Sequence, residues 1–163
     1  MNSGQLTSNI VKLATRGMYG EAISAEDLKE GFSALESSIA CDRHAAMALL
    51  LRSRAPELPL AAAIDRLERE CKRNPPNDEE FWLNWAISFL PDEVLTSNRA
   101  IRLFTYRTAF SDEVACQTNA TTTLERLARL GDAVARSILE ICASSDELKV
   151  RTNAQSSLRN LAK

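Results

Sequence analysis

The sequence predicts an all-α fold in which pairs of helices stack on one another, and three observations support this prediction. Apolar residues recur at helical spacing along almost the whole chain, and no alternating strand of useful length occurs. Only five glycines and five prolines are present in 163 residues, which is too few for a turn-rich β-sandwich. The last 19 residues also repeat a pattern that begins 34 residues earlier. A chain of this length is expected to form one domain, residues 1–163.

The first helices are predicted from their end signals. A helix near the N-terminus is expected to stop at Gly17 and Gly20. Ser24 is the predicted N-cap of the next helix, because Asp27 lies three residues further on, as in a capping box. Asp42 is expected to cap the helix after that. We therefore expect an N-terminal helical cap over residues 1–24, followed by helices over 25–40 and 42–54 that form a first pair.

Prolines mark the remaining helix boundaries. Pro59 is well placed in the first turn of a helix that runs to Arg73. The Asn-Pro-Pro-Asn sequence at 74–77 is the clearest break in the chain, and Pro91 is expected to stop the next helix. Eight or nine helices are expected in total, and the later ones lie at about 59–73, 78–90, 97–110, 112–130, 132–143 and 146–162.

An internal repeat is the most informative feature of the chain. Nine of nineteen positions are identical when residues 111–129 are aligned with residues 145–163. The helices that precede these segments also align, so one unit is a helix pair of about 34 residues. One pair cannot bury its apolar face alone, whereas stacked pairs share a continuous core. We expect stacked pairs over residues 25–163, with the clearest repeats at 96–129 and 130–163.

The segment from Val150 to Ala162, VRTNAQSSLRNLA, resembles the second-helix pattern of HEAT-like and armadillo-like repeats. That pattern has Val-Arg, an alanine three residues later, a leucine four residues after that, and then Asn-Leu-Ala. The preceding copy departs from it at Gln117, where the pattern has arginine, and at Arg126, where it has asparagine. The resemblance implies a short α-solenoid in which the second helices line a binding groove, but such a fold hosts many functions.

Three positions of this pattern suggest contacts or ties between units. In armadillo-like repeats an asparagine at the position of Asn160 hydrogen-bonds the backbone of an extended peptide, and a solvated asparagine is the alternative. Arg151 is expected to pair with an acidic loop residue, Asp132 or Asp112, and so to tie neighbouring units. The candidates for contact with a partner protein are Trp82, Trp85, Gln117, Arg126, Arg151 and Asn160.

The two tryptophans lie on a helix that is apolar on nearly all sides. Residues 81–89 hold four of the nine aromatic residues in the chain. A helix of this kind is usually buried, so the first interpretation places Trp82 and Trp85 in the core. The alternative is that one indole also lines the groove and anchors a partner, because tryptophan is enriched at binding hot spots.

The distribution of charge bears on the kind of partner. The formal net charge is −2, so a chain-wide basic surface for nucleic acid is missing. Residues 1–96 carry a net charge of −5 and residues 97–163 carry +3. A partner protein with a basic surface would complement the acidic central region. The late arginines are interleaved with acidic residues, which argues against nucleic acid as the partner.

The sequence also bears on cellular location. The longest uninterrupted apolar run, Ala45–Leu51, is far shorter than the ~20 residues that span a bilayer, so no membrane partner is expected. The N-terminus has no basic start and no apolar signal core, which favours the cytoplasm. The four cysteines stand far apart and are expected to be reduced thiols.

Few residues could support catalysis. His44 is the single histidine, and a Cys–His pair with Cys41 would have to form across the helix start predicted at Asp42. No grouping of histidine and cysteine has the spacing of zinc ligands, and no glycine-rich phosphate loop occurs. We therefore expect no enzyme activity, no metal and no cofactor.

These observations predict a noncovalent protein-binding module. It would act either as an inhibitor that covers another protein, such as an immunity protein against a toxin, or as an adaptor. The alternative is a HEAT-like nucleic-acid-binding protein or DNA base-excision enzyme, which would need a carboxylate beside a tryptophan. Trp85 near Asp78 or Glu79 is the candidate for that site. A homodimer formed through an open end of the stack is a further possibility.

Overall fold

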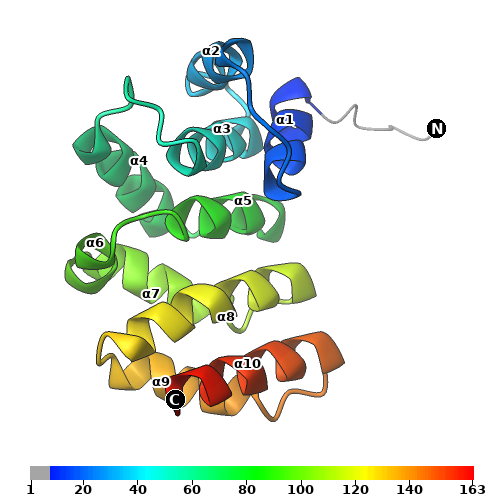
Figure 1. Cartoon of the computed structure of the whole chain (residues 1–163), viewed down its shortest axis with the longest axis vertical. Helices are drawn as coiled ribbons and strands as arrows, with labels where there is room; N and C mark the ends of the chain where they lie inside the picture. Colours follow the sequence, from blue (N-terminus) through cyan, green and yellow to red (C-terminus); the bar gives the residue numbers. More distant parts are fainter. Residues whose placement is uncertain (1–7) are drawn as a thin grey trace.

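The computed structural model describes residues 8–163, and the side chains at positions 77 and 78 lie outside that description. This part of the chain forms ten helices and no strand, which confirms the prediction of an all-α fold. The helices are arranged along the long axis of the molecule, with α1, α2 and α3 at one end, α2 outermost, and α9 and α10 at the other (Figure 1). They are α1 (Asn9–Met18), α2 (Ala25–Ala34), α3 (Ala40–Arg52), α4 (Leu60–Lys72), α5 (Asn77–Ile87), α6 (Asp92–Ser97), α7 (Arg99–Thr108), α8 (Val114–Arg129), α9 (Ala133–Cys142) and α10 (Leu148–Leu161).

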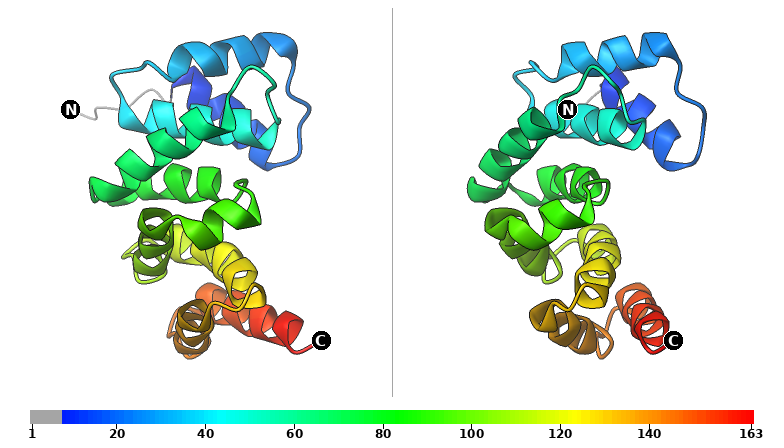
Figure 2. Two further views of the ribbon diagram at one scale, coloured as in Figure 1. Left: turned by 90° about the vertical axis from the view of Figure 1, so that its left-hand side faces the viewer. Right: turned by 60° about the vertical axis from the view of Figure 1, so that its left-hand side comes forward.

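The helices form two rows. In the first row α3 packs against α5, α5 against α8, and α8 against α10. In the second row α4 packs against α7, and α9 packs against α8 and α10 of the first row. The right-hand view of Figure 2 separates the rows, with α4, α7 and α9 on one side and α5, α8 and α10 on the other. At the N-terminal end α1 and α2 both pack on α3.

The start of α2 confirms the capping prediction. The Ser24 hydroxyl accepts a hydrogen bond from the Asp27 N–H at 3.1 Å, and the Asp27 carboxylate accepts one from the Ser24 N–H at 2.8 Å. The two side chains thereby satisfy backbone donors that the first turn of a helix leaves free. This capping box fixes where α2 begins.

Asp42 does not cap a helix, contrary to the prediction. α3 begins two residues earlier, at Ala40, and its N-cap residue Ile39 makes no side-chain cap. The Asp42 carboxylate lies in the first turn and accepts hydrogen bonds from the hydroxyls of Ser8, at 2.5 Å, and Ser37, at 3.2 Å. Asp42 therefore links the start of α3 to the start of α1, a long-range role that has no local sequence signal.

Two further boundaries differ from the prediction. Gly17 lies inside α1 and is buried, and the chain turns only at Gly20, whose φ is +87°. A Cβ at Gly17 would lie 3.4 Å from Ile23 and 3.5 Å from Leu49, which are ordinary van der Waals distances, so the packing of α1 does not require glycine here. Pro91 does not end the preceding helix, because α5 already ends at Ile87, and Pro91 is instead the N-cap residue of the additional helix α6. Proline suits a helix start, where no N–H is needed.

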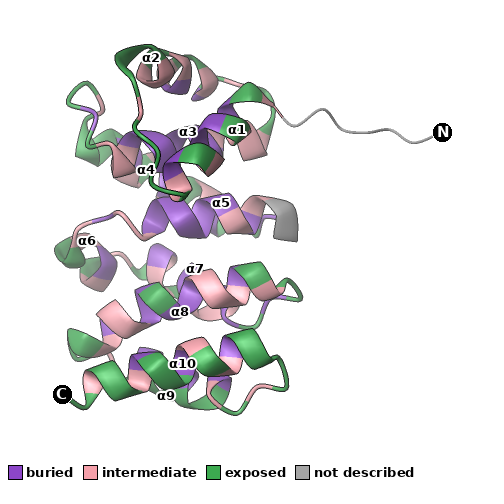
Figure 3. Ribbon diagram, turned by 45° about the vertical axis from the view of Figure 1, so that its right-hand side comes forward, coloured by how far each residue is buried: buried purple, intermediate pink, exposed green. Residues whose placement is uncertain are grey.

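The apolar core runs along the whole stack. Buried residues are concentrated in α3 and α5, which Figure 3 shows in purple, and continue through α7, α8 and α9. In α3 every residue from His44 to Leu50 is buried, and in α5 every residue from Glu80 to Ile87 except Phe81. Within residues 8–163, no helix is both long enough and apolar enough to traverse a lipid bilayer.

The cap of α2 gives a test of this description. We expect Ser24→Ala to lower the free energy of unfolding by about 1 kcal/mol, because the Asp27 N–H loses its acceptor. Urea denaturation of the purified protein measures the change. Ser38→Ala is the control, since Ser38 is also exposed and lies outside the helices. An equal loss in both variants would contradict the role given to the capping box.

Candidate functional site

A stripe of polar side chains follows α8 and continues on α10, and we call it the α8–α10 face. On α8 it consists of Thr118, Asn119, Thr122, Glu125, Arg126 and Arg129, which are exposed or half-buried. On α10 it consists of Lys149, Thr152, Asn153, Ser156, Arg159 and Asn160, which are likewise exposed or half-buried. The spacing of three and four residues places each set on one side of its helix. The two helices pack directly against each other, so the stripes are neighbours (Figure 3).

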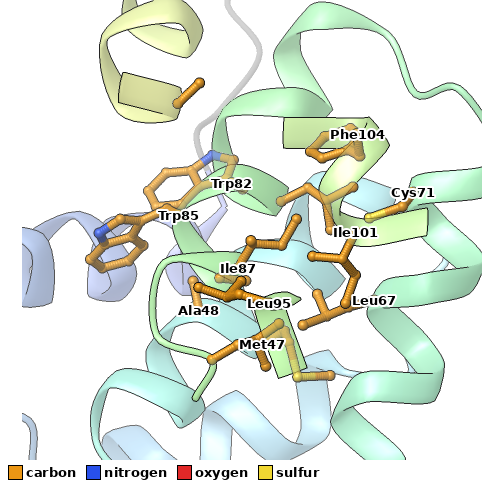
Figure 4. Close-up of a cluster of buried hydrophobic side chains, with 14 of the residues drawn as sticks. Met47, Ala48, Leu67, Cys71, Trp82, Trp85, Ile87, Leu95, Ile101 and Phe104 are labelled. Carbon is orange, nitrogen blue, oxygen red and sulfur yellow. The ribbon is translucent and has the colours of Figure 1, made fainter. Parts of the chain in front are cut away.

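The aromatic residues of α5 belong to the core instead of this face. Trp82 is 8% exposed and Trp85 is 7% exposed. Both lie in a chain of edge-to-face contacts, with ring centroids 5.1 Å apart for Phe81 and Trp82, 5.7 Å for the two tryptophans, and 5.3 Å for Trp85 and Phe89. Figure 4 shows the two indoles on one side of α5 and Ile87 on the other. The structure thus places both tryptophans where the core interpretation expects them.

Arg126 ties α8 to the end of α5. Its guanidinium donates to the carbonyl of Ser88 at 2.7 Å and to the carbonyl of Leu90 at 2.8 Å. It also pairs with the Asp92 carboxylate at 2.5 Å. The carbonyls that follow the last turn of α5 are left without helical partners, and a cation is favoured at that end of the helix dipole. The HEAT-like and armadillo-like pattern has asparagine at this position, whereas in this chain Arg126 links α8 to the end of α5.

Asn160 occupies the equivalent position on α10 and remains exposed. Its amide nitrogen lies 3.4 and 3.5 Å from the two carboxylate oxygens of Glu125 on α8. Glu125 also accepts from Arg129 at 2.6 Å. The three side chains form a small polar cluster across the α8–α10 contact, within reach of solvent.

Gln117 of α8 and Arg151 of α10 occupy equivalent positions and make the same kind of contact. The predicted pairing of Arg151 with Asp132 or Asp112 is wrong. The Gln117 amide donates to the carbonyl of Ser111, six residues before it. The Arg151 guanidinium donates to the carbonyl of Ser145 at 2.5 Å, also six residues before it, and not to Asp132 or Asp112. Each side chain thus closes the loop that leads into its own helix.

The same loop occurs before α3. The Arg43 guanidinium donates to the carbonyl of Ser37 at 2.8 Å, and the Ser37 hydroxyl accepts from the Ile39 N–H at 3.1 Å. In the last repeat the Ser145 hydroxyl likewise accepts from the Glu147 N–H at 3.2 Å. The separation of 74 residues between Ser37 and Ser111 is not a simple multiple of 34, so a search at one fixed period does not detect this copy.

Four of the eight described acidic groups of the central region, residues 57–93, form salt bridges within the protein. Salt bridges join them to nearby basic side chains, often on the same helix. The pairs are Glu68 with Lys72, Glu70 with Arg73, Glu80 with Arg107, and Asp92 with Arg126. Glu57, Asp65 and Glu93 are exposed, and in the described part of the chain no salt bridge involves them. The acidic surface open to a partner is therefore smaller than the sequence suggests.

The structure also assembles a buried polar cluster that the sequence did not reveal. His44 of α3, Glu70 of α4 and Glu79 of α5 each offer a ligand atom, and these atoms lie within 4.8 Å of one another. The His44 side chain is 3% exposed, and its Nε2 is 3.2 Å from a carboxylate oxygen of Glu70. Burial lowers the pKa of His44 while Glu70 acts in the opposite sense, so the imidazole is neutral at neutral pH.

Glu79 and Trp85, the described candidates for a base-excision site, have different neighbours in the structure. Glu79 lies with His44 and Glu70, whereas Trp85 packs between Trp82 and Phe89. The expectation for Asp78 falls on a side chain outside the described residues. One sequence signal was available for the cluster, namely a histidine in the middle of an apolar helix. Its partners follow 26 and 35 residues later, too far away for a spacing rule.

The buried thiols are held in their protonated form. Burial raises the pKa of Cys71 to about 12 and that of Cys116 to about 11. It also raises the pKa of Cys142. Because the thiolate is the nucleophile and the metal ligand, these three residues are poorly suited to either role at neutral pH.

The tie made by Arg126 is open to test. We expect Arg126→Ala to lower the free energy of unfolding by about 2 kcal/mol, because two carbonyls and a carboxylate lose a charged donor. Arg129→Ala is the matched control, since Arg129 is exposed, lies on the same helix and makes only the surface pair with Glu125. Its removal is expected to cost less than about 0.5 kcal/mol. Chemical denaturation that ranks the two variants equally would contradict the assignment.

Comparisons with known proteins do not extend this description. No protein-family model, no curated protein and no solved structure matches the chain. The resemblance to HEAT-like and armadillo-like repeats therefore rests on the residues of the last repeat alone.

Proposed function

We propose that this protein is a noncovalent protein-binding module, and that the α8–α10 face is the surface that contacts the partner. One observation carries the proposal. Thr118 and Asn119 of α8 recur as Thr152 and Asn153 of α10. The Thr118 hydroxyl oxygen is buried and the Asn119 amide donates to the carbonyl of Phe81 at 3.4 Å, whereas Thr152 is exposed and Asn153 is half-buried. Packing explains why buried positions of a repeat are alike, but most surface positions tolerate substitution with little effect on stability. Identity at Thr152 and Asn153, which are open to solvent, is therefore better explained by contact with a partner.

The chemistry of the face suits a polypeptide partner. Hydroxyl and amide side chains both donate and accept hydrogen bonds, as backbone peptide groups do. Asn160 and Ser156 add such groups at the C-terminal end of α10, and Thr122 adds one on α8. The partner would meet few aromatic anchors, because the tryptophans are buried. We thus infer a contact dominated by hydrogen bonds.

We further propose that the helix pairs form a short α-solenoid of HEAT-like or armadillo-like type. The units would be α4 with α5, α7 with α8, and α9 with α10, preceded by α2 with α3 and by α1 as the N-terminal cap. The unbroken row of α3, α5, α8 and α10 supports this interpretation, because each second helix packs on the next. The loop closures at Ser111 and Ser145 support it as well, since they recur at the repeat period.

The proposal covers an inhibitor that masks another protein in the cytoplasm, or an adaptor. A partner with a basic surface remains our prediction, with Glu57, Asp65 and Glu93 as the acidic groups left exposed. The arginines of the last repeats support a protein partner over a nucleic acid. Arg126, Arg129 and Arg136 form salt bridges with acidic residues of the chain itself and are less available to phosphates. The lining of the face offers binding groups, so we infer no catalytic step there.

The proposal is tested by a variant of the face and a matched control. Thr122→Arg with Ser156→Arg adds two charged, bulky side chains at exposed positions of α8 and α10. Ser137→Arg with Ser144→Arg adds the same charge at exposed positions in and after α9. Affinity capture from the native lysate, read by mass spectrometry at two salt concentrations, compares both with the unmodified protein. Melting curves verify that all three proteins are folded.

We expect one protein to be retained in stoichiometric amount by the unmodified chain and by the α9 control. The face variant is expected to retain at least tenfold less of it, because the new arginines obstruct the contact. Recovery of nucleic acid alone, or of a second copy of the chain alone, would overturn the proposal. Equal loss in the face variant and the control would show that the contact lies elsewhere.

A further inference from the structure

The junction of α3, α4 and α5 buries polar atoms that have no partner. Among the described residues, the Nδ1 atom of His44 and the Oε2 atom of Glu79 have no hydrogen-bond partner, while the Nε2 atom of His44 lies 3.2 Å from a carboxylate oxygen of Glu70. Buried polar groups are nearly always paired, because leaving one unpaired forfeits its hydration without compensation. Two buried atoms without a partner in one cluster therefore call for an explanation. The cluster is on α3, α4 and α5, away from the α8–α10 face, so it is independent of the protein-binding proposal.

The atoms of this cluster match the ligands of a transition-metal ion. An imidazole nitrogen and two carboxylate oxygens are ligand types that zinc accepts, at about 2.0–2.2 Å from the ion. The three candidate ligand atoms lie within 4.8 Å of one another, so small side-chain rotations bring them around one ion. Two carboxylates and a neutral imidazole also balance the charge of a divalent cation. The three ligands come from three helices, whose backbones hold the site in place.

A small cavity adjoins the cluster. It has a volume of about 70 Å³ and is lined by residues that include His44, Glu70 and Arg43. A water molecule occupies about 30 Å³ in the liquid, so one or two waters fit. Zinc sites with three protein ligands keep a water in the fourth position, and this cavity provides room for it.

We propose that His44, Glu70 and Glu79 bind a zinc ion, with a water molecule from the adjoining cavity as the fourth ligand. The ion gives a partner to the orphaned Glu79 oxygen and to one ring nitrogen of His44. It links α3, α4 and α5, the helices that join the N-terminal helices to the rest of the stack. Because zinc binds the folded site and not the dispersed residues of the unfolded chain, it stabilises the fold.

Two arginines share Glu70 with the proposed ion. Arg73 pairs with its Oε2 atom, and Arg43 lies 3.7 Å from its Oε1 atom. The Arg73 side chain is 52% exposed, so it can turn into solvent with little cost when the ion binds. Arg43 is anchored on the Ser37 carbonyl and stays beside the carboxylate. It then acts as an outer partner that orients a ligand, as such groups commonly do at metal sites.

The experiment uses the full chain without a tag and with its cysteines kept reduced. Zinc binding is measured by equilibrium dialysis against zinc chloride with elemental analysis, and by the rise in Tm on adding the ion. Glu79→Gln keeps the shape of the side chain and removes the carboxylate, and His44→Gln removes the imidazole. Glu68→Gln is the control, because Glu68 is also on α4 and is not part of the cluster. Cobalt replaces zinc for absorption spectra that report the ligand type.

We expect one zinc ion per chain, and at least tenfold weaker binding by Glu79→Gln and by His44→Gln. The control should bind within twofold of the unmodified protein, and its Tm should rise equally on adding zinc. The cobalt spectrum should lack the thiolate charge-transfer band. If His44→Gln fails to fold, Glu79→Gln decides the question by itself. Substoichiometric zinc, undiminished binding by Glu79→Gln, or a thiolate band that reports the cysteines as ligands would each overturn the proposal.

Discussion

The arrangement of the whole molecule depends on the burial of α5. This helix is apolar on nearly all sides, so it is stable only where other helices cover it completely. α3 covers it toward the N-terminal end and α8 toward the C-terminal end, with α4 and α7 beside it. Its tryptophans fill the space between these neighbours, and Leu83, Ala86 and Ile87 are fully buried. Because neither half of the chain covers α5 alone, the N-terminal helices and the last repeats are held together around it.

Polar contacts then set the register of the helices around this core. Asn98 is the N-cap of α7 and its amide also donates to Glu68 of α4 at 2.9 Å. Asp132 caps α9 and also accepts from the hydroxyl of Tyr106 on α7. Arg126 links α8 to the end of α5 in the same way. Side chains near helix ends thus serve two purposes, which explains why residues that look available for a partner are engaged within the protein.

Local features of the fold could be predicted, and features that join distant segments could not. The capping box at Ser24 was predicted correctly because both of its residues lie within one turn. The cap assigned to Asp42 was wrong because its hydroxyl partner Ser8 comes from another helix. The helix α6 was missed because its six residues are too few to show a period. For the candidate sites, the exposed repeat on α8 and α10 was visible in the sequence, whereas the grouping of His44 with Glu70 and Glu79 was not.

The sequence by itself determined the all-α class, the helix positions to within a few residues, and the repeat that places similar side chains on α8 and α10. These are properties of neighbours along the chain, and the helical period expresses them directly. Only the tertiary structure decided that Arg126 closes α5, that Arg151 closes its own loop, and that three helices bring a histidine to two glutamates. Such contacts depend on how the helices pack against each other, which is set by the shape of the shared core and not by spacing along the chain.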